Sequence, residues 1–264
     1  MDRARIKTFL LLLLLAVNLV FLALIVTDRI QEARLQSETR TELVQALERL
    51  GIDIDYAAIP DCEPQPVIFI ERDTQAEDAA ATAILGGPAQ GIHEGGGIYR
   101  WTGTYGEGET RQASFWFALA RELSDTEADF QRLLEAMDVT VRQMELVIPG
   151  NNWEVTFVLT EDGLPVMGSQ ITFSGFANML FEVSGTALWG ERQRYAAGPQ
   201  LDVTTALIAL AGHLQETHTA TRFERVEMGY DLLEGPGYLT LRPIWIVATD
   251  GGTFLVDRQS GEIR

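Results

Sequence analysis

An uninterrupted apolar stretch near the N-terminus constrains this chain more than any other feature. Residues 8–26 contain no charged side chain, and Arg3, Arg5 and Lys7 precede them. As a helix, this stretch spans roughly 28 Å, close to the thickness of a bilayer's hydrocarbon core. It is longer than the apolar region of a cleaved signal peptide, which has about 7–15 residues, and no small-x-small cleavage site directly follows it. We predict a retained transmembrane helix over 8–27, with cleavage as the alternative.

The flanking charges orient this helix. Basic residues lie before it, and the cytoplasmic flanks of membrane helices carry an excess of Lys and Arg. We therefore expect residues 1–7 in the cytoplasm and the chain after Asp28 in the extracytoplasmic space. The exported 237 residues contain 17 basic and 37 acidic residues, a formal charge of −20. This charge disfavours binding to nucleic acid or to anionic membrane surfaces.

The exported chain begins with a predicted helix and a loop. Residues 28–50 have a helix-forming composition, with Leu43 and Leu47 at helical spacing before Gly51, so we expect a juxtamembrane stalk helix. The segment 52–66 is rich in proline and carboxylates and predicts a connecting loop. The exported part is long enough to bury a core without disulfides.

A glycine-rich segment, residues 86–97, stands out in this region. It lacks the Gly-Lys-Ser/Thr ending of a P-loop and the ordered glycines of a dinucleotide fingerprint. It also leads into a predicted strand rather than a helix. We interpret it as a mobile loop rather than as a phosphate-binding site.

From residue 98 a regular pattern occurs twice, as two strands, one helix and three strands. The first helix, over 124–138, begins with the capping box Ser124-x-x-Glu127, and the second has Asp202 as its N-cap. Both helices are amphipathic. Their apolar faces consist of Phe130, Leu133, Leu134 and Met137 in the first, and Val203, Ala206, Leu207, Leu210, Ala211 and Leu214 in the second.

Asp-Gly pairs predict a hairpin at the end of each unit. Asp162-Gly163 and Asp250-Gly251 separate the last two strands of the first and second units. The pattern as a whole predicts an α+β fold, in which a transmembrane helix is followed by two antiparallel sheet-plus-helix domains. The expected divisions are the cytoplasmic N-terminus 1–7, the transmembrane helix 8–27, the stalk 28–50, a first domain 51–168 and a second domain 169–264.

No arrangement of residues points to catalysis. His213 and His218 are five residues apart and so do not share a helical face as zinc-binding His-x-x-x-His does, and His93 lies in the glycine-rich segment. The sequence has no Gly-x-Ser-x-Gly or Ser-x-x-Lys motif, and the carboxylates of Glu161-Asp162 fall on a predicted turn, where solvation is their ordinary state. We predict that the protein is not an enzyme and uses no metal or cofactor.

A single cysteine and three tryptophans complete the candidate residues. Cys62 has no second cysteine to pair with, and we expect an unreactive thiol among prolines and acids. Trp153, Trp189 and Trp245 fall on predicted strands, where we expect them in the core. An exposed aromatic residue beside a sheet edge would instead mark a partner surface.

Both ends of the chain resemble YycI-type regulatory proteins of Gram-positive bacteria. At the N-terminus the resemblance rests on Asp2 to Thr8, followed by a Leu-rich span with Asn18 before Leu19-Val20-Phe21-Leu22. The C-terminal part is also similar to PepSY-type modules. The segments that carry this second resemblance are Met228-Gly229-Tyr230, Leu241 to Ile246, Phe254 to Asp257 and Ser260 to Ile263.

The resemblance implies a non-enzymatic regulator anchored by one helix. Such proteins associate with a YycH-type protein and with an essential sensor histidine kinase that governs cell-wall homeostasis, and their membrane helix contributes to restraining the kinase. An Asn within a bilayer favours interhelical hydrogen bonds, worth about 0.6–2 kcal/mol. We therefore predict that Asn18, Phe21 and Leu22 contact a partner helix, and tolerance of Asn18 without a partner is the alternative.

Two other functions stay open at this point. One is a PepSY-like module that binds a wall or peptide ligand or inhibits a protease. The other is a membrane-tethered enzyme of unknown chemistry. A ligand-sized pocket in the exported part favours the first of these.

Overall fold

The computed structural model describes residues 38–264 except for residues 125 and 149. The expected N-terminus 1–7 and transmembrane helix 8–27 lie outside the described residues, together with the first part of the expected stalk. Within the described ranges, no helix is both long and apolar enough to cross a membrane.

Helices and strands follow one another through short connections. A helix over residues 38–49 comes first. It is followed by β1 (Asp53–Ile54), the 3-10 helix η1 (Tyr56–Ala58), β2 (Val67–Arg72), α2 (Thr74–Leu85), β3 (Gln90–Gly95), β4 (Ile98–Thr102), β5 (Gly106–Thr110), β6 (Ser114–Glu122), α3 (Thr126–Ala136), β7 (Thr140–Val147), β8 (Asn152–Glu161), β9 (Leu164–Phe176), β10 (Met179–Thr186), β11 (Gly190–Tyr195), α4 (Val203–Thr217), β12 (Arg222–Gly235), β13 (Tyr238–Thr249) and β14 (Gly252–Asp257).

The predicted α+β class is confirmed, but one mixed sheet takes the place of the two expected antiparallel sheets. The 14 strands of the described chain form a sheet whose main path is β11-β2-β13-β12-β9-β10-β6-β5-β4-β3, and β1, β7, β8 and β14 lie off this path. Strand β12 pairs in parallel with β1 and with β9. The other pairings between the described strands are antiparallel.

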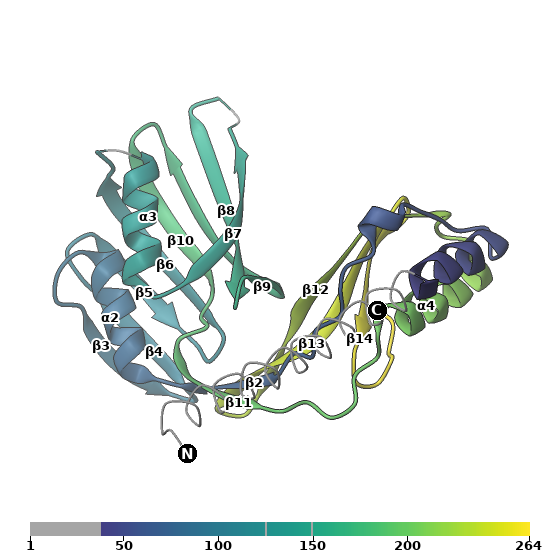
Figure 1. Ribbon diagram of the computed structural model, residues 1–264. Helices are drawn as coiled ribbons and strands as arrows, with labels where there is room; N and C mark the ends of the chain where they lie inside the picture. The colour runs from purple at the N-terminus through teal and green to yellow at the C-terminus, as the bar shows by residue number, and fades with distance from the viewer. Residues whose placement is uncertain (1–37, 125, 149) are drawn as a thin grey trace, which may run out of the picture.

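The sheet carries its helices in two lobes (Figure 1). In the first lobe, α2 and α3 pack beside each other on the strands from β3 to β10; in the second, α4 and the helix 38–49 pack on β12, β13 and β14. The two parts of the sheet join where Tyr230 and Asp231 of β12 pair with Val166 and Met167 of β9. These two residue pairs make a narrow connection.

Strand pairing departs from the expected division along the chain. The expected boundary at residue 168 falls inside β9, which pairs with β8 on one side and β10 on the other. Strand β2 belongs to the expected first domain, yet it pairs with β11 and β13. Because of these pairings, the two predicted repeat units do not form two separate sheets. Alternation of side chains identifies a strand but does not specify which strands it pairs with.

One hydrophobic core lies between the helices and the sheet of the second lobe. All six residues of the predicted apolar face of α4 are buried there, and Asp202 caps the helix by accepting a hydrogen bond from the Thr205 N–H at 2.7 Å. Leu43 and Leu47 of the helix 38–49 are buried in the same core. The described end of the expected stalk is therefore packed against the second lobe rather than standing free.

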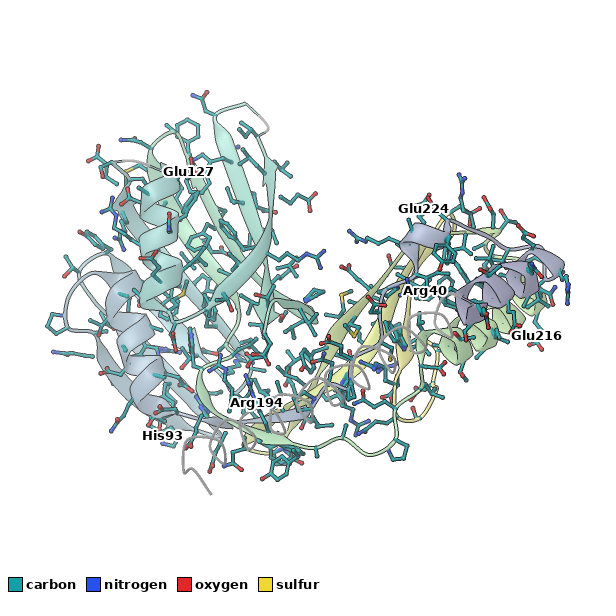
Figure 2. The ribbon with its side chains drawn as sticks, in the orientation of Figure 1. Arg40, His93, Glu127, Arg194, Glu216 and Glu224 are labelled. Carbon is teal, nitrogen blue, oxygen red and sulfur yellow. The ribbon has the colours of Figure 1, made fainter. Side chains whose placement is uncertain are left out.

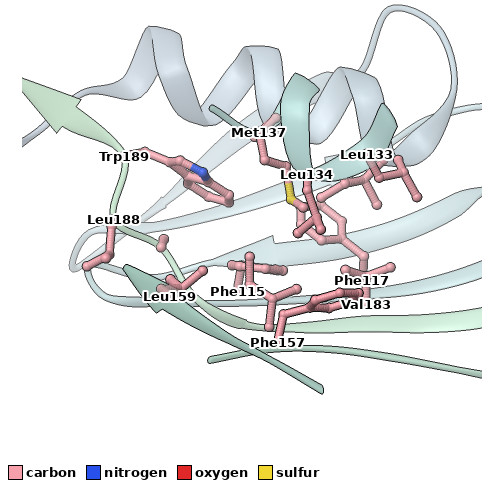
Figure 3. Close-up of a cluster of buried hydrophobic side chains, with 14 of the residues drawn as sticks. Phe115, Phe117, Leu133, Leu134, Met137, Phe157, Leu159, Val183, Leu188 and Trp189 are labelled. Atoms are coloured by element: carbon pink, nitrogen blue, oxygen red, sulfur yellow. The ribbon is translucent and has the colours of Figure 1, made fainter. Parts of the chain in front are cut away.

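The other core lies under α2 and α3. Figure 3 shows Leu133 and Leu134 of α3, and Met137 in the turn directly after it, pointing toward the strands that carry Phe117 and Phe157, so the predicted apolar face is confirmed. The helix begins at Thr126, two residues later than predicted. The N–H of Ser124 donates to the Asp129 carboxylate at 2.8 Å, whereas the predicted capping box assigned it to Glu127.

The glycine-rich segment differs from its prediction. Residues 90–95 are strand β3, which pairs with β4, so the expectation of a mobile loop is wrong for them. Both faces of β3 are exposed, which is why its sequence lacks the alternation of a half-buried strand. Gly91 faces Trp101, and a Cβ atom at Gly91 would lie 2.4 Å from that ring, so the close approach requires glycine.

The predicted Asp-Gly hairpins are confirmed. Asp162 and Gly163 join β8 to β9 with φ values of 52° and 78°, as a two-residue turn with two positive φ angles requires. Asp250 and Gly251 join β13 to β14.

Candidate functional site: an aromatic groove

Three adjacent strands carry aromatic side chains on the face that points away from the core. Ile68 and Ile70 of β2 are buried, so Phe69 between them points to the opposite face. The ring of Phe69 lies 5.2 Å from that of Tyr195 on β11 and 5.8 Å from that of Tyr238 on β13. Tyr195 is 51% exposed and Tyr238 is 40% exposed.

These rings line an open groove with a volume of about 980 Å³, which we call the aromatic groove. Its lining combines the three rings with polar side chains and with residues of three connecting segments. The lining residues are Val67, Phe69, Glu71, Gln193, Tyr195, Ala196, Pro236, Gly237, Tyr238, Thr240, Arg242 and Gln259.

Two opposite charges lie at opposite ends of the aromatic groove. At one end, Glu71 of β2 lies opposite Tyr238 of β13. At the other end, Ile68 lies opposite Leu241, so Arg242, the next residue of β13, lies opposite the beginning of β2. The two ends lie about four residues apart along the strands, or about 13 Å. Within the described chain neither charged side chain forms an ion pair.

Strand β11 forms one wall of the groove, and its opposite face is held by ion pairs. Glu161 at the end of β8 accepts hydrogen bonds from Arg192 Nε at 3.1 Å and from Arg194 Nη2 at 3.0 Å. Arg194 also donates to Asp162 at 2.9 Å, and Figure 2 shows Arg194 where the two lobes meet. The hydrogen bonds to Glu161, and then to Asp162, raise the pKa of Arg194.

This arrangement corrects the prediction for the Glu161-Asp162 pair. The expectation of two solvated carboxylates is wrong for Glu161, which is only 5% exposed. Glu161 is the last residue of β8, directly before the Asp162-Gly163 turn, and its contact with β11 comes from the tertiary structure.

A tyrosine lies behind these ion pairs. Tyr230 of β12 is fully buried, and its hydroxyl donates to Gln65 Oε1 at 3.4 Å. Burial raises the pKa of Tyr230 to about 12, and the negative charges of Asp162 and Glu161 add to the effect.

A buried arginine connects the predicted loop 52–66 to the second lobe. Arg258 Nη2 lies 3.2 Å from Cys62 Sγ and 3.0 Å from the Glu63 carbonyl oxygen, and its guanidinium lies 4.7 Å from the ring centre of Trp245. Burial lowers the pKa of Arg258. The thiol of Cys62 therefore lies beside a guanidinium, a neighbour that its surroundings in the sequence do not indicate.

The residues considered for catalysis do not come together. His93 on β3 lies beside Tyr99 with ring centres 4.7 Å apart and the rings tilted by 32°, whereas His213 lies in α4 and His218 ends that helix. Across residues 38–264, apart from the two that are not described, no cluster of His, Cys, Asp and Glu has the arrangement of a metal site. The predicted partner contacts Asn18, Phe21 and Leu22 lie outside the described residues.

The tryptophans follow their predictions only in part. Trp189 and Trp245 are buried as expected, although Trp189 lies between β10 and β11 rather than on a strand, and Trp153 is half-buried. Trp116, which the sequence did not single out, is 46% exposed on β6. Sequence reasoning also missed the aromatic groove, because its rings come from strands far apart in the chain.

Comparison with solved structures shows the fold of the described chain. A crystal structure of an uncharacterized protein from Eubacterium rectale ATCC 33656 matches with a TM-score of 0.52 and 13% identity, over 81% of this chain and 89% of the other. The Bacillus megaterium YpeB C-terminal domain matches with a TM-score of 0.37 and 12% identity, over 74% of this chain and 97% of the domain. Neither protein carries a YycI-type name, and only the first likeness is strong enough to support a shared fold.

Comparison with protein families gives no match. A comparison with curated proteins also gives none.

Proposed function

We propose that this protein is a membrane-anchored extracytoplasmic regulator that acts by contact with other proteins and not by catalysis. The single observation that carries this proposal is the aromatic groove, where two half-exposed tyrosines flank Phe69 on a sheet face that no helix of the described residues covers. Exposed aromatic patches of this kind are typical of partner surfaces.

The partner in this proposal is a sensor histidine kinase that governs cell-wall homeostasis, together with a YycH-type protein. Support for this choice comes from the sequence resemblance to YycI-type proteins at both ends of the chain. In the proposal the helix 8–27 contacts the kinase within the membrane through Asn18, Phe21 and Leu22, and the exported part makes contacts above it.

A PepSY-like ligand-binding or protease-inhibiting module is the second candidate. The volume of the aromatic groove, about 980 Å³, favours it, since ligand sites occupy about 300–1,000 Å³. In this case the exported part would keep its activity without the native membrane helix.

Affinity purification of the full chain from mildly solubilised membranes tests the proposal. Three changes are compared with the native protein: residues 1–27 replaced by an unrelated membrane helix, the groove variant Tyr195→Ser/Tyr238→Ser, and the control Trp116→Ser/Phe181→Ser. The control removes two aromatic side chains that are each 46% exposed on β6 and β10.

We expect a histidine kinase and a second single-pass protein to elute with the native protein and with the control, and to be depleted by the helix replacement and by the groove variant. If the helix replacement alone depletes the kinase, the contact with the kinase lies within the membrane and not at the aromatic groove. Absence of a kinase from every eluate would contradict the regulator proposal and favour the PepSY-like module.

A further inference from the structure

We propose that the aromatic groove binds an extended peptide segment in which a basic, an apolar and an acidic side chain follow one another at alternate positions. This inference rests on the proposed function and specifies the chemistry of the partner. It is carried by the order of charges along the groove, from Glu71 through Phe69 to Arg242.

The first step concerns the two unpaired charges. Asp231, which is level with Arg242 on the neighbouring strand, is bound by Arg264 at 2.6 Å and so does not neutralise Arg242. Glu71 likewise has no cation bound to it in the described chain. A bound segment that places a carboxylate near Arg242 and a cation near Glu71 therefore gains two ion pairs.

The second step concerns spacing. In an extended chain, side chains on one face repeat every two residues, about 6.6 Å apart, so positions i and i+4 span about 13 Å. This matches the estimated separation of the two charged ends. Position i+2 then falls over Phe69, where Tyr195 and Tyr238 provide apolar contact on either side.

The third step concerns shape. Sites for small molecules enclose most of the ligand surface, whereas the aromatic groove lies open along the face of β2 and its two neighbours. Extended peptides commonly bind in aromatic-lined grooves of this form. The groove therefore fits a chain that enters at one end and leaves at the other.

Binding of labelled peptides to the full chain in nanodiscs, followed by fluorescence anisotropy, tests the inference. The three probes carry Lys-Ser-Leu-Ser-Glu, Lys-Ser-Leu-Ser-Lys or Glu-Ser-Leu-Ser-Glu between glycine ends. We expect the native protein to prefer the first, Arg242→Glu to prefer the second and Glu71→Arg to prefer the third, by about two- to fivefold for each changed pair. Tyr195→Ser/Tyr238→Ser should lower the affinity for the preferred peptide about tenfold or more.

The same order of affinities in all of these proteins would overturn the inference, as would failure of every peptide to bind. Dimerisation of the native protein that the groove variant abolishes would assign the groove to a second copy of the chain, and saturable binding of a wall oligosaccharide without peptide binding would assign it to a glycan. Either result contradicts a peptide site. If no peptide binds but the kinase still co-purifies, the peptide inference is wrong and the proposed function is still supported. If peptides bind but no kinase co-purifies, the peptide inference is supported and the proposed function is wrong.

Discussion

Arg194 on β11 and Glu161 at the end of β8 form a hydrogen-bonded ion pair, with 3.0 Å between Nη2 and Oε1. The pair ties the edge strand beside the aromatic groove to the turn of the first lobe. Glu161 is buried and also accepts from Arg192, so one carboxylate holds two arginines of the same strand. The position of β11 therefore depends on Glu161, which lies more than 30 positions before Arg194 in the chain.

Replacing this carboxylate should destabilise the protein. We expect Glu161→Gln to lower the free energy of unfolding by about 1–2 kcal/mol, because both arginines lose a charged acceptor but remain partly accessible to water. Urea unfolding of the full chain in detergent micelles measures the change. Asp162→Asn is the matched control, with an expected loss below about 0.5 kcal/mol, since that carboxylate is half exposed. Equal losses in the two variants would contradict the assigned role of Glu161.

Tyr230 predicts a loss of stability in alkaline solution. Its pKa is about 12 in the folded protein and about 10 when unfolded, so between these values the unfolded chain has released a proton that the folded chain still holds. Stability from this group is complete below pH 10 and falls by up to about 1.4 kcal/mol per pH unit as the pH rises toward 12. We expect Tyr230→Phe to show a smaller fall when unfolding is measured at pH 9, 10.5 and 12. Parallel pH dependences for both proteins would rule out this contribution.

Two buried tryptophans should respond differently to the same substitution. Trp245 Nε1 donates to the Leu201 carbonyl at 3.1 Å, whereas no hydrogen-bond partner for Trp189 Nε1 is found in the described part of the chain. Trp245→Phe loses a hydrogen bond and leaves a part-buried carbonyl without its donor, so we expect it to cost about 1 kcal/mol more than Trp189→Phe. Thermal unfolding of both variants checks the difference, and an equal or reversed order would contradict it.

The packing of the helix 38–49 gives a further prediction. Leu47 is fully buried against the second lobe, so Leu47→Ala should cost about 2–5 kcal/mol through lost contacts and a cavity. A free stalk would tolerate the change. Leu146→Ala on β7 removes the same atoms from a side chain that is 49% exposed and should cost much less. Urea unfolding distinguishes the two, and a loss below about 0.5 kcal/mol for Leu47→Ala would contradict the packing.

Local features of this protein follow from its sequence. The apolar face of α4, its cap at Asp202 and the turn at Asp162-Gly163 each depend on residues a few positions apart, and each is where the pattern predicts. Helical period, capping chemistry and positive φ are local properties, so a single segment is enough to specify them. The retained membrane helix and its orientation rest on the same kind of evidence and stay predictions.

Tertiary structure alone decided which strands meet. Strand β2 has the same alternation whether it pairs with β4 or with β13, and only its pairing with β11 and β13 brings Phe69 between Tyr195 and Tyr238. The burial of Glu161 likewise depends on β11 folding back across about 30 residues. Contacts between distant segments are selected by the packing of the whole chain, and a period of two carries no information about the partner strand.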